Sequence, residues 1–334
     1  MNYDENIIGK INEYLSKDVR SDFLIYNNSN LNFDDKKIYD IVIVDIKLNS
    51  QSDLNFLLQK IYDKLKNGGI AIFFYLELED FENKFLTSKF TFLKYIKILF
   101  YYVFLRAFPK IPYLNKIFNL IKLKERVISR AEVWGRLTYT GFEIEIEIKS
   151  GENFYLIVKK IYERSKNPNP SFYPIIKLNR VGLNGKIIKI HKLRSMYPYS
   201  EFIQKKVFEQ KKLNNIGKFQ DDFRISKFGK FIRKYWLDEL PQLYDWLRGE
   251  IKLVGIRAMS QHFFSLYPED YKQKYLKVKP GIISPIFDEK TSGFSDIVKI
   301  EEEYLDSYLK NPMITDIKYF FKTISQILSG VRSK

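Results

Sequence analysis

The chain has 334 residues, 45% of them hydrophobic and 16% aromatic, which suffices for two buried cores and excludes a disordered chain. Its 56 basic and 40 acidic residues give a net charge of +16, which favours anionic partners such as phosphorylated molecules, acidic lipid surfaces or nucleic acid. The absence of cysteine excludes disulfides and thiolate chemistry, and the presence of only two histidines argues against a multi-histidine metal site. The polar, acidic start of the chain does not have the pattern of a secretory signal.

The first half of the chain predicts a parallel α/β layer. Buried strands are expected over residues 23–26, 41–46 and 70–75, with a helix over 54–65 between the second and the third. A helix over 129–137 follows, and then two strands, 141–148 and 154–158, which form a hairpin. This order resembles the later half of a methyltransferase-type Rossmann domain. No Gly-x-Gly loop accompanies it, so we interpret residues 1–163 as a degenerate, non-catalytic Rossmann-like domain.

A basic, aromatic stretch runs from residue 83 to residue 124 with nine lysines or arginines and no acid. Its apolar run over 98–105 is too short to span a bilayer, which takes about 20 residues. A wide apolar face edged by lysine and tyrosine favours a helix in the membrane interface, with an anionic lipid surface as partner. A core helix whose lysines reach outward is the alternative. The predicted membrane contacts are Ile98, Leu99, Phe100, Val103 and Phe104.

The second half, residues 164–334, is predicted to be a separate domain. Its start, residues 164–174, contains three prolines among polar residues, as linkers do. Asn184-Gly185 between two apolar runs predicts a hairpin, because both residues tolerate positive φ. The returning strand carries Lys192 and Arg194 at its end. A plain basic hairpin on the surface is the alternative, and neither His191 nor His262 has a partner in the sequence that suggests a catalytic triad.

Two adjacent acids, Asp238 and Glu239, follow a short helix that Ser226 should cap. Simple capping explains acids and a proline at the start of a helix. Adjacent acids near Arg233 can also perform phosphoryl chemistry, in which one carboxylate attacks phosphorus, the other holds a divalent metal and the arginine takes phosphate charge. The first helix is expected to bury Phe228, Phe231, Ile232, Tyr235 and Trp236, and the helix after the acids Leu240, Leu243, Tyr244 and Leu247.

Six motifs in the second half occur in a fixed order, which makes chance agreement very rare. They are a glycine–asparagine–glycine hairpin, Lys-x-Arg-Ser-Met, Asp-x-Arg-Ile, Leu-Asp-Glu-Leu-Pro-Gln, Val-Gly-x-Arg and Lys-Pro-Gly-Ile, and they start at Gly182, Lys192, Asp222, Leu237, Val254 and Lys279. Together they resemble the bacterial sugar transferase family, the monotopic phosphoglycosyl transferases, over residues 172–330. The resemblance implies an α+β catalytic domain after the Rossmann-like one, so the predicted fold class is α/β.

The resemblance also implies a reaction. Asp238 matches the family's nucleophile, which attacks the β-phosphorus of a UDP-sugar, releases UMP and forms an aspartyl phosphosugar. A polyprenol phosphate, undecaprenyl phosphate in bacteria, then takes the sugar phosphate in the first membrane step of polysaccharide or glycoconjugate biosynthesis. Glu239 matches the acid that binds Mg²⁺. The cations that would bind phosphate are Lys192, Arg194, Arg224, Arg233 and Arg257.

The implied location is the cytoplasmic face of the bacterial inner membrane, with peripheral or monotopic attachment. The family usually has a membrane-entering helix just before the catalytic domain, and residues 164–174 contain none. The loop over 254–258 lacks both prolines of the family's Val-Gly-Pro-Arg-Pro. Ile283-Ser284 replaces its usual Thr-Gly, which puts the choice of sugar or acceptor in doubt.

Three other functions compete with this one. A catalytically inactive, membrane-docked scaffold of a glycan assembly complex is the main alternative, and the retained acids and arginines argue against it. A nucleic-acid-binding protein is disfavoured because no motif for nucleic acid accompanies the charge. A metal-dependent glycosyltransferase is disfavoured because no Asp-x-Asp occurs. The sequence leaves open whether the chain forms a homo-oligomer.

Overall fold

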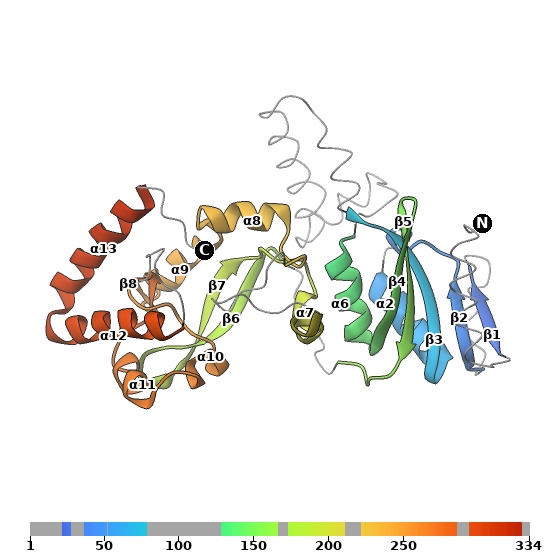
Figure 1. The fold of residues 1–334 in the computed structure, drawn as a ribbon, viewed down its shortest axis with the longest axis horizontal. Helices are drawn as coiled ribbons and strands as arrows, with labels where there is room; N and C mark the ends of the chain where they lie inside the picture. Colours follow the sequence, from blue (N-terminus) through green and yellow to red (C-terminus); the bar gives the residue numbers. More distant parts are fainter. Residues whose placement is uncertain are drawn as a thin grey trace, which may run out of the picture. The chain divides into compact units, whose positions relative to one another are not determined.

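The computed structural model describes residues 22–27, 37–51, 53–78, 128–165, 173–210, 222–285 and 294–328 (Figure 1). The chain divides into two compact units, Met1–Phe172 with Tyr197–Glu209, and Tyr173–Met196 with Gln210–Lys334. The segment Tyr197–Glu209, which the sequence analysis placed in the second domain, thus belongs to the first unit. The predicted membrane contacts between Ile98 and Phe104 lie outside the described residues and stay a prediction.

The first unit contains a mixed five-stranded sheet, as the sequence pattern predicted. Its strands are β1 (Phe23–Tyr26), β2 (Tyr39–Val44), β3 (Leu65–Leu76), β4 (Phe142–Ser150) and β5 (Asn153–Lys160). The order is β1-β2-β3-β5-β4, in which β1, β2 and β3 run parallel and β5 pairs antiparallel with both neighbours. The parallel layer and the closing hairpin are therefore both present, and the chain is a mixed α/β protein.

Two described helices pack with this sheet, and both begin at side-chain caps. Asp53 accepts a hydrogen bond from the Phe56 amide at the start of α2 (Leu54–Lys64), after the short η1 (Leu48–Ser50). Ser129 does the same for Glu132 in α6 (Arg130–Thr140). Helix α2 contacts β2 and β3, while α6 contacts β4, and the two helices contact each other. The predicted helix over 54–65 is confirmed, and it buries one face, with Leu54, Leu57, Leu58 and Ile61 all buried.

The segment η5 (Ser200–Ile203) to α7 (Gln204–Gln210) joins the first unit through a close backbone approach. A Cβ atom on Gly135 would lie 2.2 Å from the Tyr199 carbonyl oxygen, so only glycine admits this contact with α6. The Tyr199 ring is buried there and lies edge-on to Tyr139.

The second unit opens with the predicted hairpin. Strands β6 (Ile175–Val181) and β7 (Ile187–Leu193) pair antiparallel around η4 (Leu183–Gly185), where Asn184 and Gly185 both have positive φ, 55° and 76°. The remaining elements are α8 (Lys227–Lys234), η6 (Leu237–Glu239), α9 (Gln242–Leu247), β8 (Lys252–Val254), α10 (Gln261–Ser265), α11 (Glu269–Tyr275), β9 (Gly281–Ile283), α12 (Phe294–Lys310) and α13 (Pro312–Leu328). Strands β8 and β9 pair in parallel.

Buried tyrosines form the centre of this unit and bond its parts together through their hydroxyl groups. Tyr271 donates to Glu301 Oε2 at 2.6 Å, and Tyr275 donates to the Val181 carbonyl at 2.9 Å. Tyr304 donates to Asp316 Oδ1 at 2.7 Å, and Lys252 Nζ lies 2.9 Å from the same oxygen. Helices α11, α12 and α13 are thus joined to strands β6 and β8. Within the described ranges, no helix has the length and hydrophobicity needed to cross a membrane.

The buried carboxyl of Glu301 predicts a pH-dependent stability. Burial raises its pKa from 4.5 to about 7, against the opposing effect of the hydrogen bond from Tyr271. Because the folded pKa is the higher one, the stabilisation is complete below about pH 4.5 and is lost as the pH rises through about 7. Glu301→Gln keeps an acceptor for Tyr271 and cannot ionise.

We expect Glu301→Gln to raise the free energy of unfolding at pH 8.5 by about 1–3 kcal/mol and to have little effect at pH 4.5, as measured in urea. Glu303→Gln, at an exposed position of the same helix, should have no such pH dependence. An equal effect of Glu301→Gln at both pH values would contradict the assignment.

Candidate active site

Lys192 reaches the acid pair from the hairpin. Ile188 and Ile190 of β7 are buried, and Lys192 continues the same face because side chains alternate along a strand. Its Nζ lies 3.0 Å from Glu239 Oε1. Lys192, which was predicted to lie at the end of this strand, therefore contacts Glu239, one of the two acids.

Helix α8 places Arg233 beside the end of the same strand. Ser226 caps the helix by accepting a hydrogen bond from the Gly229 amide at 2.8 Å. A Cβ atom on Gly229 would lie 1.8 Å from the Ser195 carbonyl oxygen, so glycine is required for this approach. The result is that Arg233 Nε lies 2.8 Å from Ser195 Oγ.

The acids lie in a 3₁₀ turn rather than at the start of one long helix. Trp236 adopts a left-handed conformation with φ 55° and turns the chain into η6, which contains both Asp238 and Glu239. Each of the two acids is only 9% exposed. Carboxylates so poorly solvated require nearby positive charge.

The orientation of α9 corrects the sequence analysis. Leu240, Leu243 and Leu247 were expected to be buried and are 53%, 43% and 77% exposed, and Tyr244 is exposed as well. The polar residues Gln242 and Asp245 are buried instead. In the preceding helix, Phe231 and Tyr235 are likewise exposed, while Ile232 is buried as expected.

The charges around Asp238 act in opposite directions on its acidity. Burial raises its pKa, and the neighbouring Glu239 charge adds to that rise. Lys192 and Arg233 oppose the rise, Lys192 more strongly. The two cations thus stabilise the ionised form that a nucleophilic carboxylate needs.

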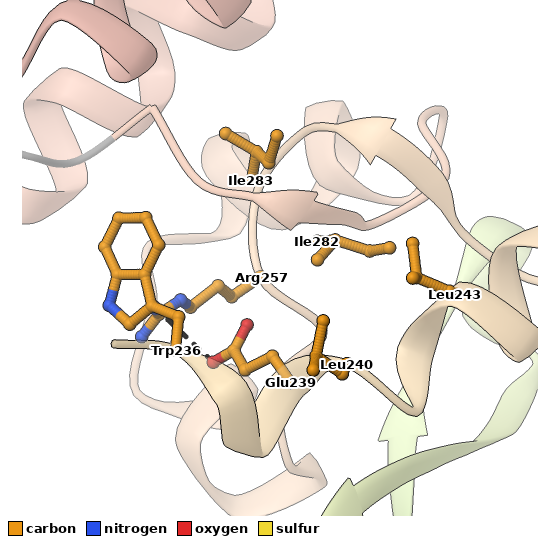
Figure 2. Close-up of a pocket in the computed structure, with 7 residues that line it drawn as sticks. All are labelled: Trp236, Glu239, Leu240, Leu243, Arg257, Ile282 and Ile283. Carbon is orange, nitrogen blue, oxygen red and sulfur yellow. Dashed lines mark ion pairs between the residues drawn. The ribbon is translucent and has the colours of Figure 1, made fainter. Parts of the chain in front are cut away.

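Glu239 lies between Lys192 and Arg257. The Arg257 guanidinium is 3.6 Å from Glu239 Oε1 and is 46% exposed (Figure 2). Its loop is fixed by a contact of two glycines, because a Cβ on Gly281 would lie 2.2 Å from the Gly255 amide nitrogen. Glu239 and Arg257 share a pocket with the side chains of Trp236, Leu240, Leu243, Ile282 and Ile283.

Two of the predicted phosphate-binding cations make other contacts. Arg194 Nε donates to the Tyr173 carbonyl at 2.8 Å. Arg224 is buried with Asp222, to which its Nε and Nη2 donate at 2.8 and 2.7 Å. Arg224 nevertheless lies close enough to Arg233 for the two charges to interact. The structure therefore pairs Lys192 and Arg257 with Glu239 and brings Arg233 close enough to Asp238 for their charges to interact, while Arg224 interacts with Arg233.

One pair that the sequence did not predict is His191, which is half-buried, and Asp245, which is buried. Asp245 Oδ2 accepts a hydrogen bond from the His191 amide at 2.8 Å, and Oδ1 lies 2.6 Å from His191 Nδ1. The two residues are 54 positions apart, so no local pattern relates them. The pair joins β7, which carries Lys192, to α9, which follows the acids.

The acid pair provides a donor set that suits Mg²⁺. No cluster of three or more possible metal ligands occurs among the residues that the structure describes. Mg²⁺ at phosphoryl-transfer sites is usually held by one or two carboxylates together with substrate phosphates and water, so two adjacent carboxylates satisfy the protein's part. Mg²⁺ at Glu239, with Asp238 beside it, stays a prediction.

The family of the chain follows from comparison with known proteins. The model of the bacterial sugar transferase family matches residues 153–330, more than half of the chain, and the chain belongs to this family. Galactosyl transferase CpsE of Streptococcus agalactiae serotype III (strain NEM316) is 36% identical over 167 residues, which cover 48% of this chain and 36% of that protein. Undecaprenyl-phosphate galactose phosphotransferase of Salmonella typhimurium (strain LT2) is 33% identical over 180 residues, 52% of this chain and 36% of that protein.

The matched regions stop short of the relatives' full length. The chain spans little more than a third of these two relatives. Among solved structures, an O-methyltransferase family 2 protein from Planctomyces limnophilus covers 39% of this chain and 32% of that protein, with 17% identity and a TM-score of 0.24. The methyltransferase likeness of the first unit stays a prediction.

The His191–Asp245 pair predicts a graded loss of stability. Asp245→Ala removes the acceptor of the His191 amide and the partner of its Nδ1 at a half-buried place, and should lower the free energy of unfolding by about 1–3 kcal/mol. Asp245→Asn keeps one acceptor oxygen and should cost about half as much. Hydrogen exchange of the β7 amides should quicken in the alanine variant. Equal losses in the two variants would contradict this role of the pair.

Proposed function

We propose that the chain transfers a sugar 1-phosphate from a UDP-sugar to a polyprenol phosphate, with Asp238 as the nucleophile. The observation that carries the proposal is the buried pair Asp238–Glu239 among Lys192, Arg233 and Arg257. A diphosphate fits such a ring of cations, and a buried carboxylate beside them is poised to react with phosphorus. The names of relatives agree with this chemistry, since one is an undecaprenyl-phosphate galactose phosphotransferase.

In the first step, a carboxylate oxygen of Asp238 forms a bond to the β-phosphorus of the donor. The bond from that phosphorus to the bridging oxygen breaks, and UMP leaves with the electron pair. Lys192 and Arg233, whose charges act on Asp238, hold the carboxylate ionised and neutralise the phosphate that approaches it.

In the second step, a phosphate oxygen of the acceptor bonds to the phosphorus of the aspartyl phosphosugar. The phosphorus–carboxylate bond breaks, the Asp238 carboxylate is restored, and a polyprenol diphosphate sugar is formed. Arg257 is half exposed next to Glu239 and can take the charge of the incoming phosphate. Mg²⁺, held by Glu239 with Asp238 as neighbour, would neutralise charge on the transferring phosphate.

Loss of the nucleophile should abolish the first step. With Mg²⁺, a panel of UDP-sugars and polyprenol phosphate, Asp238→Asn should release UMP about a thousandfold more slowly or not at all. Asp270→Asn changes an exposed acid of α11 and should keep full activity. Full activity of Asp238→Asn, with its fold intact by circular dichroism, would reject the nucleophile. If the unaltered protein released no UMP from any donor, the inactive scaffold would be the better account.

The charge of Lys192 should set the pH range of the first step. Because Lys192 lowers the pKa of Asp238, Lys192→Met should raise that pKa and move the acid limb of UMP release to higher pH. The limb is measured in single turnover without acceptor. Lys189→Met, at an exposed position of the same strand, should leave the limb in place. A slower rate with no displacement of the limb would show that Lys192 acts only by binding donor.

A further inference from the structure

The acid pair has two unlike sides. Asp238 interacts with Lys192 and Arg233, which are cations from the hairpin and from α8. Glu239 also faces the pocket in Figure 2, where Arg257 is the second charged residue and the other side chains are apolar or aromatic. Sugar hydroxyls and a nucleotide's phosphates need many polar partners. The pocket therefore suits a different molecule from the donor.

The pocket matches an amphiphile with a phosphate head. Arg257 lines the pocket, and a guanidinium group can bind phosphate through paired donors. The apolar side chains of the pocket lie beside Arg257. Leu240 and Leu243 line one side, and Ile282 of β9 points toward Leu243 (Figure 2). Ile283, the next residue of β9, also lines the pocket, with its side chain turned to the other side of the strand. In a prenyl phosphate the hydrocarbon chain begins at the phosphate ester oxygen. Its charged head and its apolar chain are therefore adjacent, as Arg257 and the apolar walls are adjacent in the pocket.

The β9 side of the pocket is held firmly in place. The Gly255 amide donates to the Ile283 carbonyl at 2.9 Å, and the Gly281 amide donates to the Ile256 carbonyl at 2.8 Å. These bonds fix β9 next to the loop of Arg257. Ile283 contributes a branched hydrocarbon side chain to the lining of the pocket.

The apolar wall continues out of the pocket along α9. Leu240, just before α9, and Leu243 and Leu247 within it recur at helical spacing and are all exposed, Leu247 most of all at 77%. A chain whose first units lie in the pocket can leave along this row without meeting a charged group of α9, because Asp245 is buried on the other side.

We infer that the pocket between α9 and β9 binds the first isoprenoid units of the acceptor, with the acceptor's phosphate at Arg257. The inference rests on the proposed function and deepens it: the donor occupies the side of Lys192 and Arg233, and the acceptor's hydrocarbon chain occupies the side of Ile283 and Leu243. Ile283 and Leu243 are then residues that determine acceptor specificity.

The test uses the full chain and two water-soluble acceptors, geranyl phosphate and ethyl phosphate, so that no bilayer is needed. Ile283→Thr and Leu243→Asn should lower kcat/KM for geranyl phosphate about fivefold or more, through KM. The loss of kcat/KM for ethyl phosphate, which has only two carbons, should be clearly smaller than the loss for geranyl phosphate. Leu266→Asn, an exposed leucine of the same unit outside the pocket, is the control.

Three outcomes would overturn the inference. An unchanged preference for geranyl over ethyl phosphate would show that the pocket does not hold the chain. A higher KM for the UDP-sugar would assign the pocket to the donor. Weaker flotation with acceptor-free vesicles, with the preference for geranyl phosphate retained, would assign the apolar wall to the membrane surface.

Failure of the proposed function can be distinguished from failure of the inference about the pocket. If the unaltered protein releases no UMP, calorimetric binding of geranyl phosphate decides the question independently of turnover. Binding that Ile283→Thr weakens while Leu266→Asn leaves it intact supports the pocket, and the absence of binding rejects it.

Discussion

The central constraint in the second unit is the burial of two adjacent carboxylates. Asp238 and Glu239 cannot remain ionised at 9% exposure unless positive groups replace the water that they have lost. Those groups come from β7, from the last turn of α8 and from the loop after β8, three places far apart in the sequence. The relative positions of these elements are therefore tied to the acid pair.

Hydrogen bonds and close packing of uncharged groups hold Arg233 and Lys192 at their distances from the acid pair. Ser195 is at the centre of them: its carbonyl accepts the Ser226 amide and approaches Gly229, while its hydroxyl accepts Arg233. Any side chain at Gly229 would push α8 away and move Arg233 with it. On the other flank, Asp245 holds the backbone of His191 and so fixes the next residue, Lys192. The electrostatics of the site thus depend on uncharged packing within a few ångströms.

Local signals in the sequence predicted the elements well. The Asn184-Gly185 turn, the Ser226 cap and the strand pattern of the first unit each depend on neighbours within a few residues, and each is confirmed. Contacts between distant positions were missed. The pairing of His191 with Asp245, for example, depends on how β7 meets α9. The ion pair of Arg224 with Asp222 was missed for another reason: the two residues are close in the sequence, but residue type alone does not reveal their burial.

The exposed leucines of α9 follow from the same constraint that buries the acids. Helical spacing places Asp238, Gln242 and Asp245 on one side of the chain, and the first of these must face the cations. Leu240, Leu243 and Leu247 must then face away, whatever their hydrophobicity. The rule that apolar residues turn inward fails here because the charged site outweighs the solvation cost of three leucines. Exposure of leucine at all three positions costs solvation free energy, which burial of the acid pair among its cations must offset.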